Sequence, residues 1–181
     1  MRVISGQAGG FALFSPKGKN VRPTSDMVKE AVFNMLSPHI DGAAFLDLFC
    51  GTGAAGIEAL SRGAKRAVFV DNSKDSITFT EKNLQHTKLM PNAELVLKSA
   101  TEFLKGNKEK FDIIFMDPPY SKGFIIPVLE LIKSTGALKE GGLCVTEYPA
   151  SENHEVSFFE VYKNKRYGRI KVLIYRALRE N

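Results

Sequence analysis

Short apolar runs alternate with amphipathic stretches through the middle of the chain, and this alternation limits the fold more than any other feature. Four of the apolar runs predict buried strands, over residues 44–48, 67–71, 94–98 and 112–116. The amphipathic stretches between them predict helices, over residues 53–62, 74–88 and 100–106. Strands that alternate with helices are typical of βαβ units, so we expect an α/β fold built on a parallel sheet.

The last third of the chain predicts a different end to the sheet. A helix is expected over residues 124–135 and a strand over 143–148. Two further strands are expected over 156–161 and 170–178, joined by a polar turn at 162–168. Adjacent strands joined by a short turn must be antiparallel. We therefore predict a mainly parallel, seven-stranded sheet that closes with an antiparallel hairpin.

The first forty residues predict a small extension to this sheet. Residues 2–5 and 11–14 are expected to pair as a short hairpin, and a helix is expected over 25–36. A chain of 181 residues has the usual size of one domain. We therefore expect a single domain over residues 1–181, made of an extension over 1–37 and a catalytic core over 38–181.

The cysteine, histidine and hydropathy patterns exclude several classes of protein. Cys50 and Cys144 both lie in apolar runs, so we expect them to be reduced and buried. The three histidines are scattered and no metal-ligand spacing occurs, which predicts a protein without a metal site. The first residues lack the apolar core of a signal peptide, and no apolar run reaches about 20 residues, so we expect a cytoplasmic protein without a membrane partner.

Positive charge gathers at the two ends of the chain. The net charge is +5, but residues 1–40 and 161–181 together contribute +9, which leaves −4 for the stretch between them. Such ends are either two solvated basic surfaces or one positive face that meets a phosphate backbone. Charge alone does not choose between these interpretations.

A glycine-rich loop follows the first predicted strand of the core and leads into a helix. It runs from Asp47 through Gly51 and Gly53 to Gly56, and its small residues let a ligand approach the backbone amides. The same spacing, with Asp71 located 20 residues after Gly51, also fits a dinucleotide-binding fingerprint. The loop by itself is therefore compatible with a nicotinamide cofactor, with S-adenosylmethionine, or with a turn that binds no ligand.

Asp47 favours S-adenosylmethionine over a dinucleotide. A dinucleotide would place its pyrophosphate at this loop, where a neighbouring carboxylate adds repulsion. S-adenosylmethionine has no phosphate and carries an ammonium and a sulfonium group, which an anion attracts. Asp71 is expected to accept hydrogen bonds from the ribose hydroxyls, and Ser99 is expected at the adenine edge. The predicted donor-binding residues are Asp47, Phe49, Gly51, Gly53, Asp71, Asn72, Ser99 and Ala100.

A second loop, Asp117-Pro118-Pro119-Tyr120, follows the fourth predicted strand directly. Two consecutive prolines restrict the backbone, so the loop is stiff. It holds a carboxylate and an aromatic ring at the carboxyl end of a strand, where open α/β sheets bind their ligands. A Pro-Pro pair alone would indicate no more than the end of a strand, but the flanking acid and tyrosine indicate an active site.

These residue types suit the methylation of an exocyclic amino group. The lone pair of such a nitrogen is delocalised into the base, which makes the nitrogen a poor nucleophile. Hydrogen bonds from the amino group to the Asp117 carboxylate and the Pro118 carbonyl would favour a pyramidal nitrogen aimed at the methyl group. Tyr120 offers a face on which an unstacked base can lie, worth about 1–3 kcal/mol. The predicted catalytic residues are Asp117, Pro118, Pro119 and Tyr120.

Three segments taken together resemble a known family. They are the run Arg22-Pro23-Thr24-Ser25-Asp26, the glycine-rich loop with its continuation to Ala64, and the loop 117–120. In this order, over nearly the whole chain, they resemble the bacterial 16S rRNA guanine-N2 methyltransferases of the RsmD type. The first segment is the most discriminating, because the other two occur in many enzymes that methylate amino groups.

The resemblance implies a class I, Rossmann-like methyltransferase fold with S-adenosylmethionine as donor. It implies a guanine of 16S ribosomal RNA as acceptor, in free RNA or within the 30S subunit. It also places Arg22 and Thr24 at the cofactor or RNA edge. With the basic ends of the chain, the predicted RNA-binding residues are Lys17, Lys19, Arg22, Thr24, Lys165 and Arg166. The chain departs from the family at Phe11 and Met27, where arginine is usual, and at Ser99, where an acid or asparagine is usual.

Three alternatives stay open. Methylation of DNA adenine or of protein glutamine uses the same loop chemistry, although Asn is more frequent there in the place of Asp117. A nicotinamide-dependent oxidoreductase would bind NAD and no S-adenosylmethionine. A non-catalytic RNA-binding module would bind RNA with a steep salt dependence and would not need Asp117.

Overall fold

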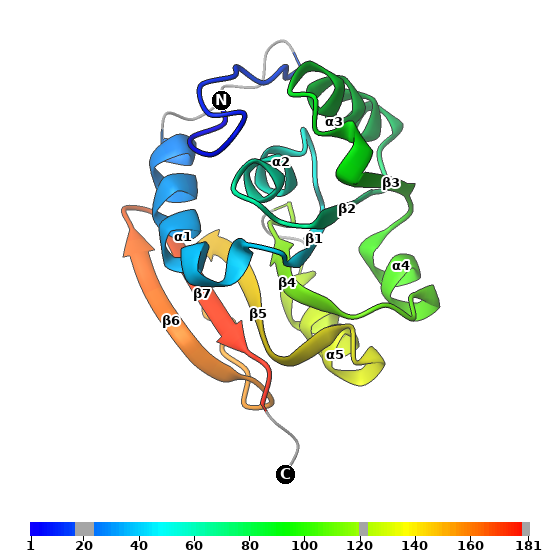
Figure 1. The fold of residues 1–181 in the computed structure, drawn as a ribbon. Coiled ribbons are helices and arrows are strands. Elements are labelled where there is room, and N and C mark those ends of the chain that lie inside the picture. Colours follow the sequence, from blue (N-terminus) through cyan, green and yellow to red (C-terminus); the bar gives the residue numbers. More distant parts are fainter. Residues whose placement is uncertain (17–23, 120–122, 179–181) are drawn as a thin grey trace.

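The computed structural model of the chain describes residues 1–16, 24–119 and 123–178, and Figure 1 shows their fold. Within these ranges a mixed sheet of seven strands runs through the molecule in the order β3-β2-β1-β4-β5-β7-β6. Helices cover both faces of the sheet. This is the α/β, Rossmann-like architecture that the sequence predicts, with an antiparallel hairpin at its end.

Five strands form the parallel part of the sheet in the described chain. They are β1 (Ala44–Leu48), β2 (Arg66–Asp71), β3 (Ala93–Leu97), β4 (Phe111–Met116) and β5 (Leu138–Pro149). The first four confirm their predicted positions to within one residue at each end. β5 begins earlier than predicted, because Leu138 pairs with Phe111 before the register shifts. β1 pairs with both β2 and β4, so the order of the strands reverses beside it.

The same described ranges contain five α-helices, namely α1 (Thr24–Ile40), α2 (Ala54–Ser61), α3 (Lys74–His86), α4 (Ala100–Gly106) and α5 (Ile125–Thr135). A short 3-10 helix, η1 (Met90–Asn92), precedes β3. All five α-helices were predicted, but α1 continues past residue 36. Leu36 and Ile40 are buried, and this packing holds the last turn in spite of Pro38. Among the described residues, none of the helices combines the length and the apolar character that a membrane span needs.

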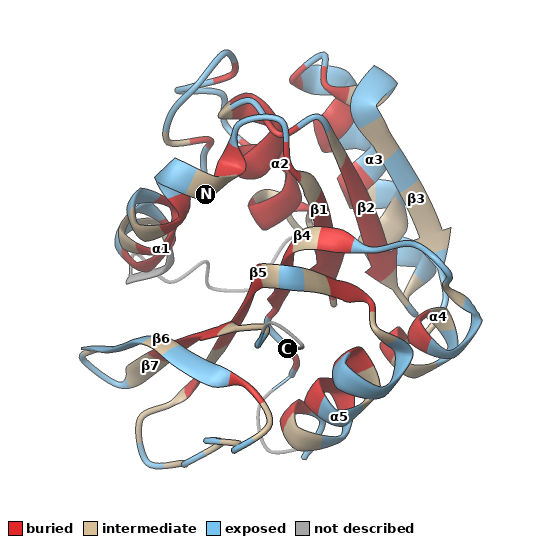
Figure 2. Cartoon of the chain, turned by 60° about the horizontal axis from the view of Figure 1, so that its bottom comes forward, coloured by how far each residue is buried: buried red, intermediate tan, exposed pale blue. Residues whose placement is uncertain are grey.

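Two hydrophobic clusters hold the sheet between its helices. The first cluster joins the sheet to α1, α2 and α3, and the second joins it to α4 and α5 (Figure 2). Val3, Ala8 and Leu13 belong to the first cluster, so the N-terminal extension packs on the core. Cys50 and Cys144 are both free and buried, which confirms the prediction made for them.

The C-terminal hairpin differs from its prediction. β6 spans Glu160–Tyr167 and β7 spans Ile170–Arg176, with Gly168 at φ +60° in the turn between them. The predicted strand at 156–161 and the predicted turn at 162–168 are therefore wrong. β6 lies at the edge of the sheet, and most of its side chains are exposed. Backbone pairing with β7 needs no apolar side chains there, so a polar run forms the strand.

The structure confirms the predicted N-terminal hairpin in part. An antiparallel bridge joins Arg2 and Ala12, and the N–H groups of Val3 and Leu13 donate to the carbonyls of Phe11 and Met1 at 2.9 and 3.0 Å. The next two amides bond to α2, where the Glu58 carboxylate accepts the N–H groups of Ile4 and Ser5 at 2.7 and 3.1 Å. These bonds use the amide groups that a longer hairpin would need.

We expect Gly56→Ala to destabilise the fold, because a Cβ atom at Gly56 would lie 2.3 Å from the Phe69 ring. Overpacking of this kind costs about 1–3 kcal/mol. Denaturant titration of the full chain, followed by circular dichroism, measures the free energy of unfolding. Gly106→Ala is the matched control, since a Cβ atom there meets no described heavy atom within 4 Å. Equal stability of the two variants would contradict the prediction.

Candidate active site

A cavity of about 450 Å³ opens at the carboxyl ends of β1, β2, β4 and β5. The loops that follow β1 and β4 form two of its walls, and the first turns of α1 form another. The cavity lies where the order of the strands reverses between β1 and β4. This is the position at which open α/β sheets bind their ligands.

The glycine-rich loop supplies most of the donor-binding residues predicted to meet here. Those that line the cavity are Asp47, Phe49, Gly51, Asp71 and Asn72. Gly51 and Gly53 have φ values of 56° and 78°, in the left-handed region that favours glycine. A Cβ atom at Gly53 would lie 2.7 Å from Thr80 Cγ2, so Gly53 lets α2 begin close to α3. Gly53 therefore shapes the glycine-rich loop without lining the cavity itself.

Asp47 is the most deeply buried carboxylate of the cavity wall, at 2% exposure. One of its oxygens accepts the backbone N–H of Gly56 at 2.9 Å, which ties the end of β1 to α2. Burial raises the pKa of Asp47 to about 7, against the opposing effect of the Gly56 hydrogen bond. The negative charges of Asp117 and Asp71 raise it further. A cation in the cavity would relieve this repulsion.

Asp71 connects the ends of two loops. Its carboxylate accepts the Gly51 N–H at 3.0 Å and the Ser73 N–H at 2.9 Å. Each carboxylate oxygen keeps a further lone pair for another donor. The contact predicted with ribose hydroxyls is therefore compatible with the hydrogen bonds that Asp71 already makes, and it stays a prediction.

Ser99 and Ala100 lie outside the residues that line the cavity. Ser99 is the N-cap of α4: its hydroxyl accepts the Glu102 N–H at 3.2 Å, and the Glu102 carboxylate accepts the Ser99 N–H at 3.0 Å. This capping box gives Ser99 a local task in starting the helix. The contact expected with adenine stays a prediction.

The loop after β4 forms the wall opposite the glycine-rich loop. Asp117 and Pro119 line the cavity, whereas Pro118 is buried behind them. Solvent reaches the Asp117 carboxylate from the cavity, but protein atoms crowd it on the other sides, and this desolvation raises its pKa to about 6. Tyr120 falls outside the described residues.

Glu147 is a cavity residue that no motif in the sequence indicated. It lies near the end of β5, beside the loop that follows β4. Burial and then the charge of Asp117 raise the pKa of Glu147 to about 8. Its signal in the sequence was a single acidic residue in the otherwise apolar run of that strand. Two carboxyl groups, Asp117 and Glu147, therefore face the same end of the cavity.

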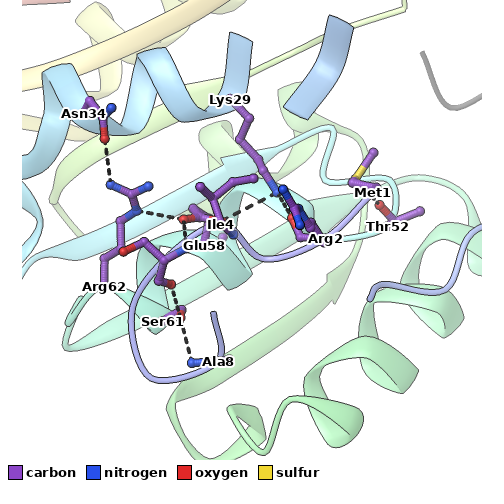
Figure 3. Close-up of polar contacts among 12 residues, drawn as sticks. Met1, Arg2, Ile4, Ala8, Lys29, Asn34, Thr52, Glu58, Ser61 and Arg62 are labelled. Carbon is purple, nitrogen blue, oxygen red and sulfur yellow. Dashed lines mark hydrogen bonds and ion pairs between the residues drawn. The ribbon is translucent and has the colours of Figure 1, made fainter. Parts of the chain in front are cut away.

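The first turns of α1 form a wall that was also not predicted. Asp26 and Lys29 line the cavity from this helix. The Asp26 Oδ1 atom is buried and has no hydrogen-bond partner among the described residues. Figure 3 shows how Lys29 is held: its Nζ donates to the Arg2 carbonyl at 2.5 Å and lies 3.6 Å from Glu58 Oε2.

The predicted RNA-binding residues do not all lie in the part of the chain that the structure describes. Lys17, Lys19 and Arg22 fall outside the described residues. Thr24 is the first residue of α1, at the helix end nearest the cavity. Lys165 and Arg166 are adjacent and exposed on β6.

Carboxylates dominate the cavity. Asp47, Asp71, Asp117 and Glu147 line it from four neighbouring strand ends, with Asp26 on α1 as a fifth. Within the described ranges, no three Asp, Glu, His or Cys side chains converge closely enough to hold a metal ion. The acids are spread around the wall, which suits an extended organic cation better than a compact anion such as pyrophosphate.

We expect Asp47→Asn to stabilise the unliganded fold at pH 8. The pKa of Asp47 is about 7 in the folded chain, against an ordinary 3.8. A raised folded-state pKa costs stability as the pH rises from about 4 to about 7, because the unfolded chain ionises without that penalty. The gain at pH 8 should reach up to about 4 kcal/mol and disappear near pH 4.

Denaturant titrations at several pH values measure this difference. The asparagine oxygen can still accept the Gly56 N–H, so the variant keeps the hydrogen bond and loses the charge. Asp75→Asn, which changes an exposed carboxylate, is the control and should show no comparable pH dependence. A variant that is less stable than the wild type at pH 8 would contradict the prediction.

Known proteins resemble this chain over most of its length. The family model described as "Conserved hypothetical protein 95" matches residues 1–176. The Escherichia coli K12 protein named Ribosomal RNA small subunit methyltransferase D is 37% identical over 147 residues, which cover 81% of this chain and 74% of that protein. YlbH of Bacillus subtilis 168, which carries a provisional rRNA methyltransferase name, is 37% identical over 181 residues, which cover 97% of this chain and 98% of YlbH.

A solved structure of a related protein has the same fold. The Escherichia coli protein yhhF, which is provisionally named a methyltransferase, superposes with a TM-score of 0.89. It is 33% identical, and the match covers 99% of each chain. The chain therefore belongs to the family described as conserved hypothetical protein 95, the RsmD family that its three sequence segments resemble.

Proposed function

We propose that this protein is an S-adenosylmethionine-dependent methyltransferase that modifies the exocyclic N2 of a guanine in small-subunit ribosomal RNA. One observation carries the proposal: Asp117 and Asp47 wall the same cavity. The loop suited to orienting an amino group and the loop suited to a cationic donor therefore open onto one space. An amino group and a methyl donor can meet there.

The charge of the cavity supports S-adenosylmethionine as donor. When bound, it supplies a methyl group on a positively charged sulfur. Asp47 and Asp117 attract that charge, and the carboxylates at the strand ends would repel the pyrophosphate of a dinucleotide. Asp71 and Asn72 would hold the adenosine end, with Ser99 and Ala100 beyond them. Phe49, Gly51 and Gly53 would shape the loop around the donor.

Asp117 has the central task on the acceptor side. Its carboxylate accepts a hydrogen bond from the N2 amino group, and the Pro118 carbonyl accepts a second. These bonds turn the nitrogen lone pair toward the methyl group, which is catalysis by positioning. The nitrogen loses one proton when its new bond to carbon forms, and a carboxylate with a pKa of about 6 can take it. Pro119 stiffens the loop, and Tyr120 would stack on the base.

The ribosomal substrate follows from the relatives and from the basic ends of the chain. The relative in Escherichia coli is named a small-subunit rRNA methyltransferase. The strongly basic last twenty residues suit a phosphate backbone. We therefore propose 16S rRNA, free or within the 30S subunit, as the partner. Lys17, Lys19, Arg22 and Thr24 remain proposed contacts on the N-terminal side.

The register of the sheet supports Lys165 as an RNA contact. Glu147 of β5 pairs with Val172 of β7, and Val172 pairs with Lys165 of β6. Directly paired residues point to the same face, so Lys165 lies on the α1 side, in one row with the cavity residue Glu147. Two strand spacings separate them, about 10 Å in all. That distance suits a phosphate close to the target nucleotide.

Methyl transfer tests the proposed function. We expect the protein to place labelled methyl groups from S-adenosylmethionine on a guanine N2 in 16S rRNA or 30S subunits that lack the modification. Asp117→Ala should lower kcat by about 10²–10³-fold and change donor affinity far less, as should Tyr120→Ala. Asp117→Asn keeps an oxygen that can accept the hydrogen bond, so its kcat should fall less than that of Asp117→Ala. Labelled methyl groups on DNA adenine or on protein glutamine would favour a DNA or protein methyltransferase instead. The absence of transfer to any guanine would overturn the proposal.

Lys165 and Arg166 provide a matched pair for RNA binding. Lys165→Ala should weaken binding to a 16S rRNA fragment and lower the slope of log affinity against log salt by about 1. Arg166→Ala should have a smaller effect, because Arg166 pairs with Lys171 on the opposite face and donates to the Gly168 carbonyl at 3.0 Å. Filter binding at several salt concentrations measures both. Equal losses of affinity in the two variants would contradict the proposal that the RNA approaches on the face of the sheet that carries Lys165 and Glu147.

A further inference from the structure

We propose that Glu147 is a specificity-determining residue, whose carboxyl group pairs with the N1–H and O6 groups of the target guanine. This inference rests on the proposed function, because it takes the N2 amino group of a guanine as the methyl acceptor. It deepens that function by separating two tasks at one end of the cavity. Asp117 orients the amino group, and Glu147 selects the base that carries it.

The register of the sheet brings Glu147 next to Asp117. Phe115 of β4 pairs with Val145 of β5 in the parallel ladder. Two positions further along, past the end of β4, Asp117 and Glu147 lie side by side. Side chains two positions apart point to the same face, and neighbouring strands lie about 4.8 Å apart. The two carboxyl groups therefore leave the sheet next to each other, on the face that also carries Asp47.

The Glu147 carboxyl group is available to a ligand. Its side chain lines the cavity and is partly exposed. No described residue donates a hydrogen bond to it or forms an ion pair with it. By contrast, Asp47 and Asp71 both accept hydrogen bonds from backbone amides of the described chain. Of these three acids, Glu147 thus has the most hydrogen-bonding capacity left for a bound base.

Guanine has groups that match this capacity. Its N2 amino group, N1–H and O6 lie in a row along the edge that pairs in a duplex, and all three lose their partners when the base is unstacked. In the proposed function, Asp117 and the Pro118 carbonyl accept the two amino protons. N1–H and O6 remain, one a donor and the other an acceptor. A carboxyl group that keeps its proton offers the converse pair, so it can form two parallel hydrogen bonds.

The surroundings of Glu147 favour this protonated form. Burial, and then the negative charge of Asp117, raise the pKa of Glu147 to about 8. Burial also raises the pKa of Asp117, but only to about 6. Near neutral pH, the pair therefore consists of a carboxylate at Asp117 and a neutral carboxyl group at Glu147. The first suits an amino group, and the second suits the neighbouring N1–H and O6.

The order of the strands matches the order of the groups on the base. β4 lies between β1 and β5 in the sheet (Figure 1). Asp47 of β1 is the proposed partner of the sulfonium, so the methyl group would lie beside the end of β4. A base whose N2 meets that methyl group at Asp117 then extends toward β5, which brings its N1 and O6 to Glu147.

Adenine and cytosine match Glu147 less well. Next to the carbon that carries the amino group, each has an acceptor nitrogen where guanine has N1–H. A neutral Glu147 forms one hydrogen bond with that nitrogen, against two with guanine. An ionised Glu147 forms none, against one with guanine. Guanine therefore has one more hydrogen bond in both states, which separates guanine methylation from the adenine methylation that uses the same loop chemistry.

A target base without N1–H and O6 tests the pairing. 2-Aminopurine keeps the N2 amino group, but its N1 is unprotonated and a hydrogen replaces O6. The experiment compares kcat/KM for methyl transfer to 16S rRNA, free or in reconstituted 30S subunits, that carries either base at the position that the wild type methylates. We expect Glu147→Leu to lower kcat/KM for the guanine RNA by about 10–100-fold. The value for the 2-aminopurine RNA should fall much less.

Two further variants and one binding measurement serve as controls. Glu147→Gln keeps an acceptor and a donor, so it should remain closer to the wild type than Glu147→Leu does. Glu140→Leu makes the same change at an exposed position near the start of β5, outside the cavity lining, and should alter neither RNA. Calorimetry should give the same S-adenosylhomocysteine affinity for Glu147→Leu and the wild type, which shows that the variant is folded.

The comparison of the two RNAs distinguishes base selection from other roles of Glu147. Its removal also changes the electrostatic field at Asp117, but that effect acts on both RNAs alike. Equal losses for the two RNAs, or no loss for either, would overturn the proposed pairing. A Glu147→Gln variant as impaired as Glu147→Leu would overturn it too. A wild-type protein that methylates no guanine would overturn the proposed function, and this inference with it.

Discussion

The hydrogen bond from the Gly56 N–H to the buried carboxylate of Asp47 fixes the geometry on which the site depends. It sets where β1 stops and where α2 starts, and so it sets the path of the loop between them. The Gly51 N–H then reaches Asp71, which joins this loop to the end of β2. Two neighbouring strand ends are thereby locked together, and the third, at Asp117, faces them across the cavity.

Most of the fold could be predicted because its central strands carry a strong hydrophobic signal. β1, β2 and β4 are buried along most of their length, so their apolar runs and boundaries agree closely with the sequence. β6 could not be found in that way, because an edge strand is stabilised by backbone pairing and its polar run from Lys163 to Arg166 resembles a turn. The N-terminal hairpin is shorter than predicted for a related reason: the amides of Ile4 and Ser5 bond to the side chain of Glu58, far away in the sequence.

The residues of the site were predictable to different degrees for the same reason. Asp47 and Asp117 each belong to a short sequence motif, so the sequence indicates them. Glu147, Asp26 and Lys29 reach the cavity only through tertiary packing, and no short pattern marks them. The result is a wall with far more negative than positive side chains, which is unfavourable for the empty protein. A positively charged ligand would restore the balance of charge. Burial is the first cause of the raised pKa values of Asp47, Asp117 and Glu147, and neighbouring carboxylates add to it at Asp47 and Glu147.

The bonds between Glu58 and residues 4 and 5 span more than fifty positions of the chain. During synthesis, the segment made first must therefore wait until α2 has emerged and docked on the sheet. Until then, the amides of Ile4 and Ser5 and the ammonium group of Lys29 lack their carboxylate partner. The order of the extension therefore depends on the core that it covers. The cavity wall at Lys29 takes its final form only in a chain in which α2 has already docked.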